Sequence, residues 1–128
     1  MAFADLRDWI DDLDEREDLK RVGAEVDWDQ ELGAITREVS SQAGPALLFD
    51  NIKDHRKTFC HRLFTNGTGT RERVCRFIGV PETTTFREMV PIFKERFSRP
   101  LKPVNVTHGP VKENILRGAE IDLKQMPV

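Results

Sequence analysis

The stretch Gly44-Pro45-Ala46-Leu47-Leu48-Phe49 places a helix stop signal directly before a continuous apolar run. Glycine followed by proline commonly ends a helix, because glycine adopts the left-handed cap conformation and proline cannot extend the hydrogen-bond ladder. Four apolar residues in succession, 46–49, are typical of a strand that is buried on both faces. We therefore expect a helix to end near residue 44 and an interior strand to follow it.

The segments around this stretch predict further helices and strands. Apolar residues recur at helical spacing over 6–13, and Leu32, Ile35 and Val39 define one face of a second helix. Alternation of apolar with charged or small residues over 22–26 predicts a half-buried strand. Residues 58–65 carry a weaker strand pattern.

Polar side chains precede the four predicted helices and are suited to cap their free backbone N–H groups. These residues are Asp5, Asp29, Thr70 and Thr85. Glu88 lies three residues after Thr85, as in a capping box. Each helix is therefore expected to begin directly after its capping residue.

The last third of the chain is rich in proline. Pro91 lies inside a helical apolar pattern, so we expect it either to kink that helix or to mark its first turn after a short 3₁₀ entry. Alternation at Val104 and Val106, and the run 111–116, predict two more short strands. An aromatic stripe at helical spacing is expected to belong to the core: Phe86, Phe93 and Phe97.

Together these elements amount to four helices and about five short strands, interleaved along the chain. We predict an α/β (α+β) fold with a small mixed sheet flanked by helices. The chain has 128 residues, which is enough for a real core, and we expect residues 1–128 to form a single domain.

Charge and composition exclude several classes of protein. The net charge of −2 argues against a nucleic-acid binder, although the chain is acidic before residue 65 and basic after it. We find no apolar run long enough to span a membrane. The acidic start is unlike an export or transit signal, and Cys60 and Cys75 are read as reduced thiols. These features predict a cytoplasmic protein.

The residues that could carry chemistry form no convincing constellation. A zinc site can be drawn from Cys60, His61, Cys75 and His108, but the spacings match no metal signature. His108 lies in a turn and His55 in a charged turn, with no nucleophile or carboxylate implied beside them. We read all of these as ordinary core or surface residues. The carboxylates of the first helix are read as a solvated face: Asp8, Asp11, Asp12, Asp14 and Glu15.

One loop has two interpretations. Gly67-Thr68-Gly69-Thr70 leads into a helix whose first turn holds Arg71 and Arg73, a setting that can bind an anion. The loop lacks the third glycine of a dinucleotide-binding motif and the lysine of a phosphate-binding loop. A plain turn followed by a helix cap is the favoured reading, and anion binding stays open.

Read in order, several segments resemble the UbiD family of decarboxylases, which use prenylated FMN. The resemblance extends over essentially the whole chain. The segments that carry it are Asp5–Ile10, Asp18–Val22, Glu25–Asp27, Leu32–Arg37, Gly44–Ile52, Gly69–Val74, Ile78–Val80, Gly109–Asn114, Ile121–Leu123 and Met126–Val128. Each segment alone is weak, but the ordered set is specific.

This resemblance implies that the chain corresponds to the N-terminal domain of a larger enzyme acting on aromatic or α,β-unsaturated carboxylic acids. In the family, a flavin-binding split barrel and a C-terminal oligomerisation domain follow, and the catalytic glutamates and arginine lie there. No catalytic, cofactor-binding or metal-ligating residue is therefore assigned in this chain, which alone is predicted to be inactive. Prenylated FMN, with Mn or Mg and potassium, is expected in the full-length enzyme and not on this segment.

The partner implied by the resemblance is the flavin-binding barrel, on the same enzyme or on a partner chain, within a homo-oligomer. The basic second half of the chain, with its proline-rich stretch at 101–116, is expected to face it. The alternative is a stand-alone assembly or anion-binding module without catalytic activity. The resemblance does not identify the acid or the direction of carbon dioxide transfer.

Overall fold

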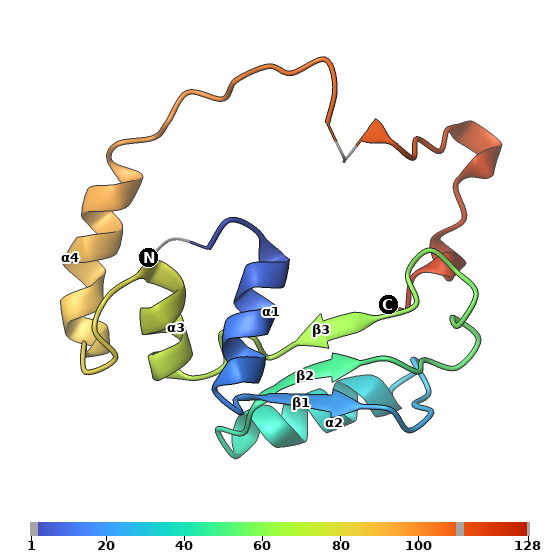
Figure 1. Cartoon of the computed structure of the whole chain (residues 1–128), viewed down its shortest axis with the longest axis horizontal. Helices are drawn as coiled ribbons and strands as arrows, with labels where there is room; N and C mark the ends of the chain where they lie inside the picture. The colour runs from blue at the N-terminus through green and yellow to red at the C-terminus, as the bar shows by residue number, and fades with distance from the viewer. Residues whose placement is uncertain (1–2, 110–111, 128) are drawn as a thin grey trace. The chain divides into compact units, whose positions relative to one another are not determined.

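The computed structural model describes residues 3–109 and 112–127, which divide into two compact units. Unit 1 comprises the described residues of 1–85 and 124–128, and unit 2 comprises those of 86–123. Figure 1 shows the order of the elements along the chain. In the described residues, no helix has the length and apolar character that crossing a membrane requires.

Unit 1 is built on a mixed three-stranded sheet in the order β1-β2-β3. β1 (Leu19–Val22) runs parallel to β2 (Ala46–Phe49), and β2 runs antiparallel to β3 (Leu63–Thr65). Parallel neighbours need a crossover, which α2 (Glu31–Ser41) provides between β1 and β2. This observation confirms the predicted small mixed sheet flanked by helices.

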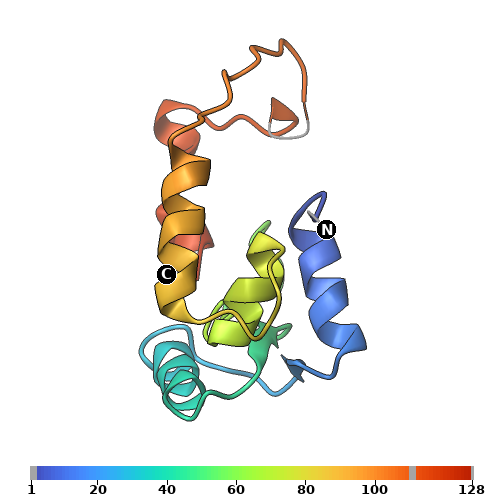
Figure 2. The same cartoon turned by 90° about the vertical axis from the view of Figure 1, so that its left-hand side faces the viewer.

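β2 is the centre of the sheet, and all four of its residues are buried. Successive side chains of a strand point to opposite faces. Ala46 and Leu48 accordingly pack with Trp9 and Leu13 of α1 (Leu6–Glu15), whereas Leu47 and Phe49 join the cluster that includes Leu32 of α2. Figures 1 and 2 show α1 and α2 on opposite sides of the sheet. The prediction of a strand buried on both faces is confirmed.

Local capping signals set the bounds of two helices. The Asp5 carboxylate accepts hydrogen bonds from the backbone N–H groups of Arg7, at 2.7 Å, and Asp8, at 3.1 Å. These bonds to the charged form lower the pKa of Asp5. α3 (Arg71–Ile78) begins after Thr70, whose hydroxyl accepts from the Arg73 N–H, and ends at Gly79 in the left-handed conformation, with φ 72°.

Three predictions about unit 1 were wrong in detail. The strand expected over 22–26 lies at 19–22, and only Val26 keeps a parallel bridge, to Ile52. The strand expected over 58–65 is confined to 63–65. Asp29 does not cap α2; the preceding position is Gln30, with φ 68° and no side-chain cap bond. Pairing with β2 decides the strand bounds, and this pairing cannot be read from local alternation.

The secondary structure of unit 2 differs more from the sequence-based prediction than that of unit 1. α4 (Phe86–Phe97) follows Thr85 and continues through Pro91, so the proline does not end the helix. The strands expected near Val104 and over 111–116 are absent from the described residues, 101–109 and 112–116, because no neighbouring strand is there to pair with them. Short 3₁₀ turns follow: η2 (Gly118–Glu120) and η3 (Leu123–Gln125).

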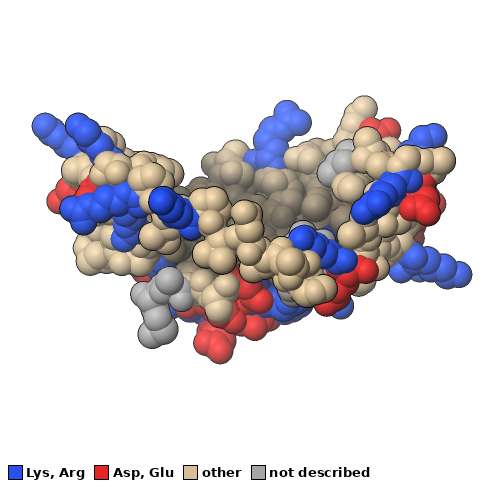
Figure 3. Space-filling view, turned by 90° about the horizontal axis from the view of Figure 1, so that it is seen from above, with Lys and Arg blue, Asp and Glu red and all other residues tan. Residues whose placement is uncertain are grey.

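The aromatic stripe of α4 was wrongly assigned to the core. Phe86 is 65% exposed and Phe97 is 78% exposed, while Phe93 is half-buried and stacks on Phe97 with the ring centroids 6.1 Å apart. The reason is that the described residues of unit 2 contain one α-helix, no strand and a short 3₁₀ turn, which cannot enclose an apolar stripe. Charged side chains of both signs also reach the surface, as Figure 3 shows.

We expect Phe49→Ala to lower the free energy of unfolding by about 3–5 kcal/mol, because it empties a fully buried site beneath α2. Phe59→Ala is the matched control: its ring is 60% exposed, so the change should stay within about 0.5 kcal/mol. Urea unfolding measures both. Equal effects of the two substitutions would contradict the assignment of β2 as the buried centre.

Candidate functional site

A buried arginine lies at the junction of α3 with the sheet. The Arg73 side chain is fully buried and comes from the first turn of α3. One guanidinium nitrogen donates to Asp18 Oδ1 at 3.2 Å, and the other donates to the Gly44 carbonyl at 2.7 Å. Asp18 directly precedes β1 and Gly44 precedes β2, so one side chain ties α3 to the starts of two strands.

A second arginine extends this contact into a network of alternating charges. Arg76, one turn further along α3, donates to the second oxygen of the Asp18 carboxylate. Its nitrogens also lie 3.7 Å from both Asp12 Oδ2 and Glu82 Oε1. Arg16 donates to Asp12 at 3.1 Å and lies 3.8 Å from Glu82. Asp12 is therefore half-buried in this network, although its sequence neighbours form the expected solvated face.

The electrostatics of this network favour a structural role. Burial lowers the pKa of Arg73, the Asp18 carboxylate raises it, and Arg76 lowers it again. An arginine nonetheless stays protonated in proteins, so Arg73 does not act as a general acid or base near neutral pH. Each oxygen of the Asp18 carboxylate already accepts a hydrogen bond from one of the two arginines. We conclude that the network fixes α3 against the sheet.

The loop that was considered for anion binding is shaped by close packing. A Cβ at Gly67 would lie 2.5 Å from the Phe64 ring, and a Cβ at Gly69 would lie 1.7 Å from Asn66 Oδ1. Asn66 donates to the Gly44 and Pro45 carbonyls, at 3.2 and 2.8 Å. Glycine is therefore required at both positions, because a larger side chain would overlap these neighbouring side chains.

The two arginines of that motif are also directed inward. Arg71 donates to the carbonyls of Glu82 and Thr84, at 2.6 and 2.7 Å, and Arg73 is held by Asp18 and Gly44 as described. The expected Thr70 cap is present. The structure thus supports the turn-and-cap interpretation of this motif.

The histidines and cysteines are dispersed. His55 is buried, contrary to its charged surroundings in the sequence, with Nδ1 3.3 Å from the Gln125 carbonyl. Cys75 is buried with Sγ 3.5 Å from the Thr84 carbonyl, whereas His61 and His108 are exposed and Cys60 is half-buried. Among residues 3–109 and 112–127, no three metal-ligating side chains come together.

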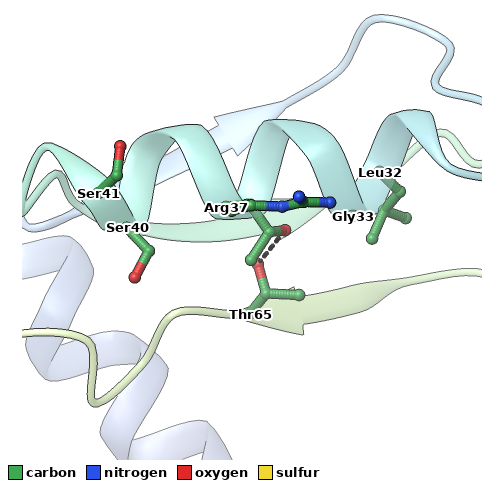
Figure 4. A pocket seen from close by; sticks show the side chains of 7 residues that line it. Leu32, Gly33, Arg37, Ser40, Ser41 and Thr65 are labelled. Atoms are coloured by element: carbon green, nitrogen blue, oxygen red, sulfur yellow. Dashed lines mark hydrogen bonds between the residues drawn. The ribbon is translucent and has the colours of Figure 1, made fainter.

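An open groove of about 570 Å³ runs between α2 and β3 (Figure 4). The hydroxyls of Thr36 and Thr65 hydrogen-bond across it at 3.1 Å. Its lining has serine and threonine hydroxyls but contains no carboxylate, histidine or cysteine, so it offers no general base to activate a hydroxyl as a nucleophile. The lining residues are Leu32, Gly33, Thr36, Arg37, Ser40, Ser41 and Thr65.

Comparison with known proteins identifies the family to which this fold belongs. Residues 10–92 match the family model of the 3-octaprenyl-4-hydroxybenzoate carboxy-lyase N-terminal domain, UbiD_N. The chain belongs to the UbiD family. It is 34% identical to pyrrole-2-carboxylic acid decarboxylase of Pseudomonas aeruginosa over 97% of this chain and 26% of that protein. The resemblance stated from the sequence motifs is confirmed.

Solved structures of UbiD enzymes share the fold. An evolved dimeric form of the UbiD-class enzyme HmfF from Pelotomaculum thermopropionicum, in complex with prFMN, has a TM-score of 0.77 at 29% identity, covering 96% of this chain and 27% of that one. Vanillic acid decarboxylase of Sedimentibacter hydroxybenzoicus, in closed form, has a TM-score of 0.71 at 25% identity, covering 89% and 24%. The chain spans about a quarter of the length of these relatives.

We expect Arg73→Met to lower the free energy of unfolding by about 3–5 kcal/mol, because it leaves the Asp18 carboxylate with one arginine fewer and removes a hydrogen bond to the Gly44 carbonyl. Arg7→Met is the control, since the Arg7 side chain is 89% exposed and should contribute at most about 0.5 kcal/mol. Thermal and urea unfolding report both. A small effect at Arg73 would refute its role in fixing α3.

Gly67→Ala should destabilise the UbiD N-terminal domain by about 1–3 kcal/mol, because the added methyl group overlaps the Phe64 ring. Gly33→Ala should stabilise it by about 0.5–1 kcal/mol, since Gly33 lies inside α2 with nothing within 4 Å of a Cβ. Comparing the two substitutions separates the free-energy cost of a steric overlap from the gain in helix propensity. A neutral Gly67→Ala, combined with phosphate binding by the parent chain, would revive the anion-binding interpretation.

Proposed function

We propose that residues 1–128 act as one N-terminal domain of a prenylated-FMN-dependent decarboxylase or carboxylase. Its substrate is an aromatic or α,β-unsaturated carboxylic acid. The domain supplies no reacting group; it supports the flavin-binding barrel, which lies in further polypeptide of the same enzyme or in a partner chain. The assembled enzyme is cytoplasmic and homo-oligomeric.

The observation that carries this proposal is the 34% identity over 97% of the chain with a decarboxylase of which the chain covers 26%. The substrate class is supported by two relatives named as decarboxylases of pyrrole-2-carboxylic acid and vanillic acid. The cofactor is supported by the HmfF complexes with prFMN and with FMN.

The described residues of this chain do not fit the metal-bound flavin themselves. They bring no three metal-ligating side chains together, and Arg73 and Arg76 already hold Asp18. We therefore assign prenylated FMN, the divalent Mn or Mg and potassium to the barrel, and we derive no chemical step in this chain. The role left for the domain is to hold the geometry of that barrel.

Unit 2 offers the surface that we assign to this contact. Its apolar side chains include Leu101, 95% exposed, Val104, 83% exposed, and Phe97, 78% exposed. Apolar side chains in such number on one short segment favour a protein contact. This assignment agrees with the expectation that 101–116 face the barrel.

The test compares the 128-residue chain alone with the chain joined to, or mixed with, a UbiD flavin-binding barrel. Each sample is incubated with prenylated FMN, desalted, and examined by visible absorbance and by carbon dioxide release from pyrrole-2-carboxylate and vanillate. We expect the chain alone to retain no flavin and the joined sample to retain it and to turn over. Flavin retained stoichiometrically by the chain alone would refute the proposal.

Leu101→Asp tests the assigned surface in the mixed sample. We expect the chain to keep its stability within about 0.5 kcal/mol, because Leu101 is exposed, while association with the barrel weakens at least tenfold. Phe59→Asp, in unit 1 and 60% exposed, is the control and should leave association unchanged. Full association of Leu101→Asp would place the contact elsewhere.

A further inference from the structure

A second cleft in unit 1, of about 430 Å³, lies between α1 and the sheet. It is separate from the arginine–carboxylate network and from the groove beside α2. Its volume falls within the range of small-molecule sites. Its lining combines apolar and cationic side chains: Leu6, Arg7, Ile10, Asp11, Arg21, Leu48, Arg62 and Phe64.

The apolar part of this cleft is a defined floor. Leu48 of β2 and Phe64 of β3 are direct partners across the antiparallel pair, so their side chains lie together on one face of the sheet. Both belong to the cluster on the α1 side, together with Ile10. The backbone at Gly67 approaches so closely that a Cβ there would lie 2.5 Å from the Phe64 ring, which restricts the ring. Leu6, 57% exposed, extends the floor toward solvent.

The rim of the cleft carries three arginine side chains. One forms a short ion pair with a carboxylate, and the other two form longer ion pairs. Arg21 donates twice to Asp14, at 2.7 and 3.2 Å, and this pairing raises the pKa of Arg21. Arg62 Nε, in contrast, lies 3.4 Å from Asp50 Oδ1, and Arg7 Nη1 lies 3.6 Å from Asp5 Oδ2. Charge-assisted hydrogen bonds are shorter, about 2.7–2.9 Å, so these two groups can exchange their contacts for a better acceptor.

We propose that this cleft binds a small monocarboxylate with an aryl or branched alkyl body. The carboxylate accepts from Arg7 and Arg62, and the apolar body lies on Leu48, Phe64 and Ile10. Asp11, the carboxylate in the lining, disfavours ligands with a second negative charge near it. This inference goes beyond the proposed function, because the site lies in the domain that contributes no reacting group.

The test is a nuclear magnetic resonance titration of the isotope-labelled 128-residue chain with benzoate as the probe and benzyl alcohol as its uncharged analogue. We expect saturable shifts of the Ile10, Leu48 and Phe64 amides with benzoate, and at least tenfold weaker binding of benzyl alcohol. Arg62→Gln should weaken benzoate binding by about tenfold, the effect of one charge-assisted hydrogen bond.

Arg37→Gln is the matched control, because Arg37 is an exposed arginine of α2 that lines the other groove. It should leave benzoate affinity unchanged, and the dispersion of the amide spectrum confirms that each variant is folded. Three results would overturn the proposal: no saturable shift, equal affinity for the alcohol, or equal losses in the two arginine variants. None of these depends on flavin binding, so this test is independent of the decarboxylase proposal.

Discussion

The burial of β2 on both faces is the constraint on which unit 1 depends. A strand with four buried apolar side chains requires cover above and below, and α1 and α2 provide it. The same strand also needs a hydrogen-bonded neighbour on each edge, which β1 and β3 provide. The clusters on the two faces share no residue, so each helix has its own set of contacts with the strand.

The arginine–carboxylate network solves a different problem, the attachment of α3. This helix has few apolar side chains facing the sheet, and its buried residues are Arg73 and Cys75. A buried charge is costly unless it is paired and hydrogen-bonded, so Asp18 and the Gly44 carbonyl make the burial of Arg73 possible. Such polar contacts tolerate little change in geometry, whereas an apolar interface of similar area can repack.

Features with local causes could be predicted from the sequence, and features with distant causes could not. The strand at 46–49 and the caps Asp5 and Thr70 follow from neighbouring residues and were found. The bounds of β1, and the absence of strands over the described residues of 101–116, depend on whether a partner strand is present. Alternation alone cannot reveal that.

The network was missed for the same reason. Arg73 and Asp18 are 55 residues apart, and an arginine in a first helical turn normally faces solvent. The available signal was that Arg73 and Arg76 lie on one face of α3. A solvent-exposed helix face shows the same sequence pattern, so this signal alone does not indicate burial. The family resemblance, in contrast, rested on motifs spread along the chain and did not require contacts to be known.

The two thiols of unit 1 differ in accessibility, since Cys75 is fully buried in α3 and Cys60 is half-buried in a loop. A thiol-specific reagent therefore reaches Cys60 through small motions of its loop. It reaches Cys75 only when α3 separates from the sheet. The alkylation rate of Cys75 under native conditions consequently reports the opening of one helix. The chain thus carries an intrinsic probe for the local detachment of α3, separate from global unfolding.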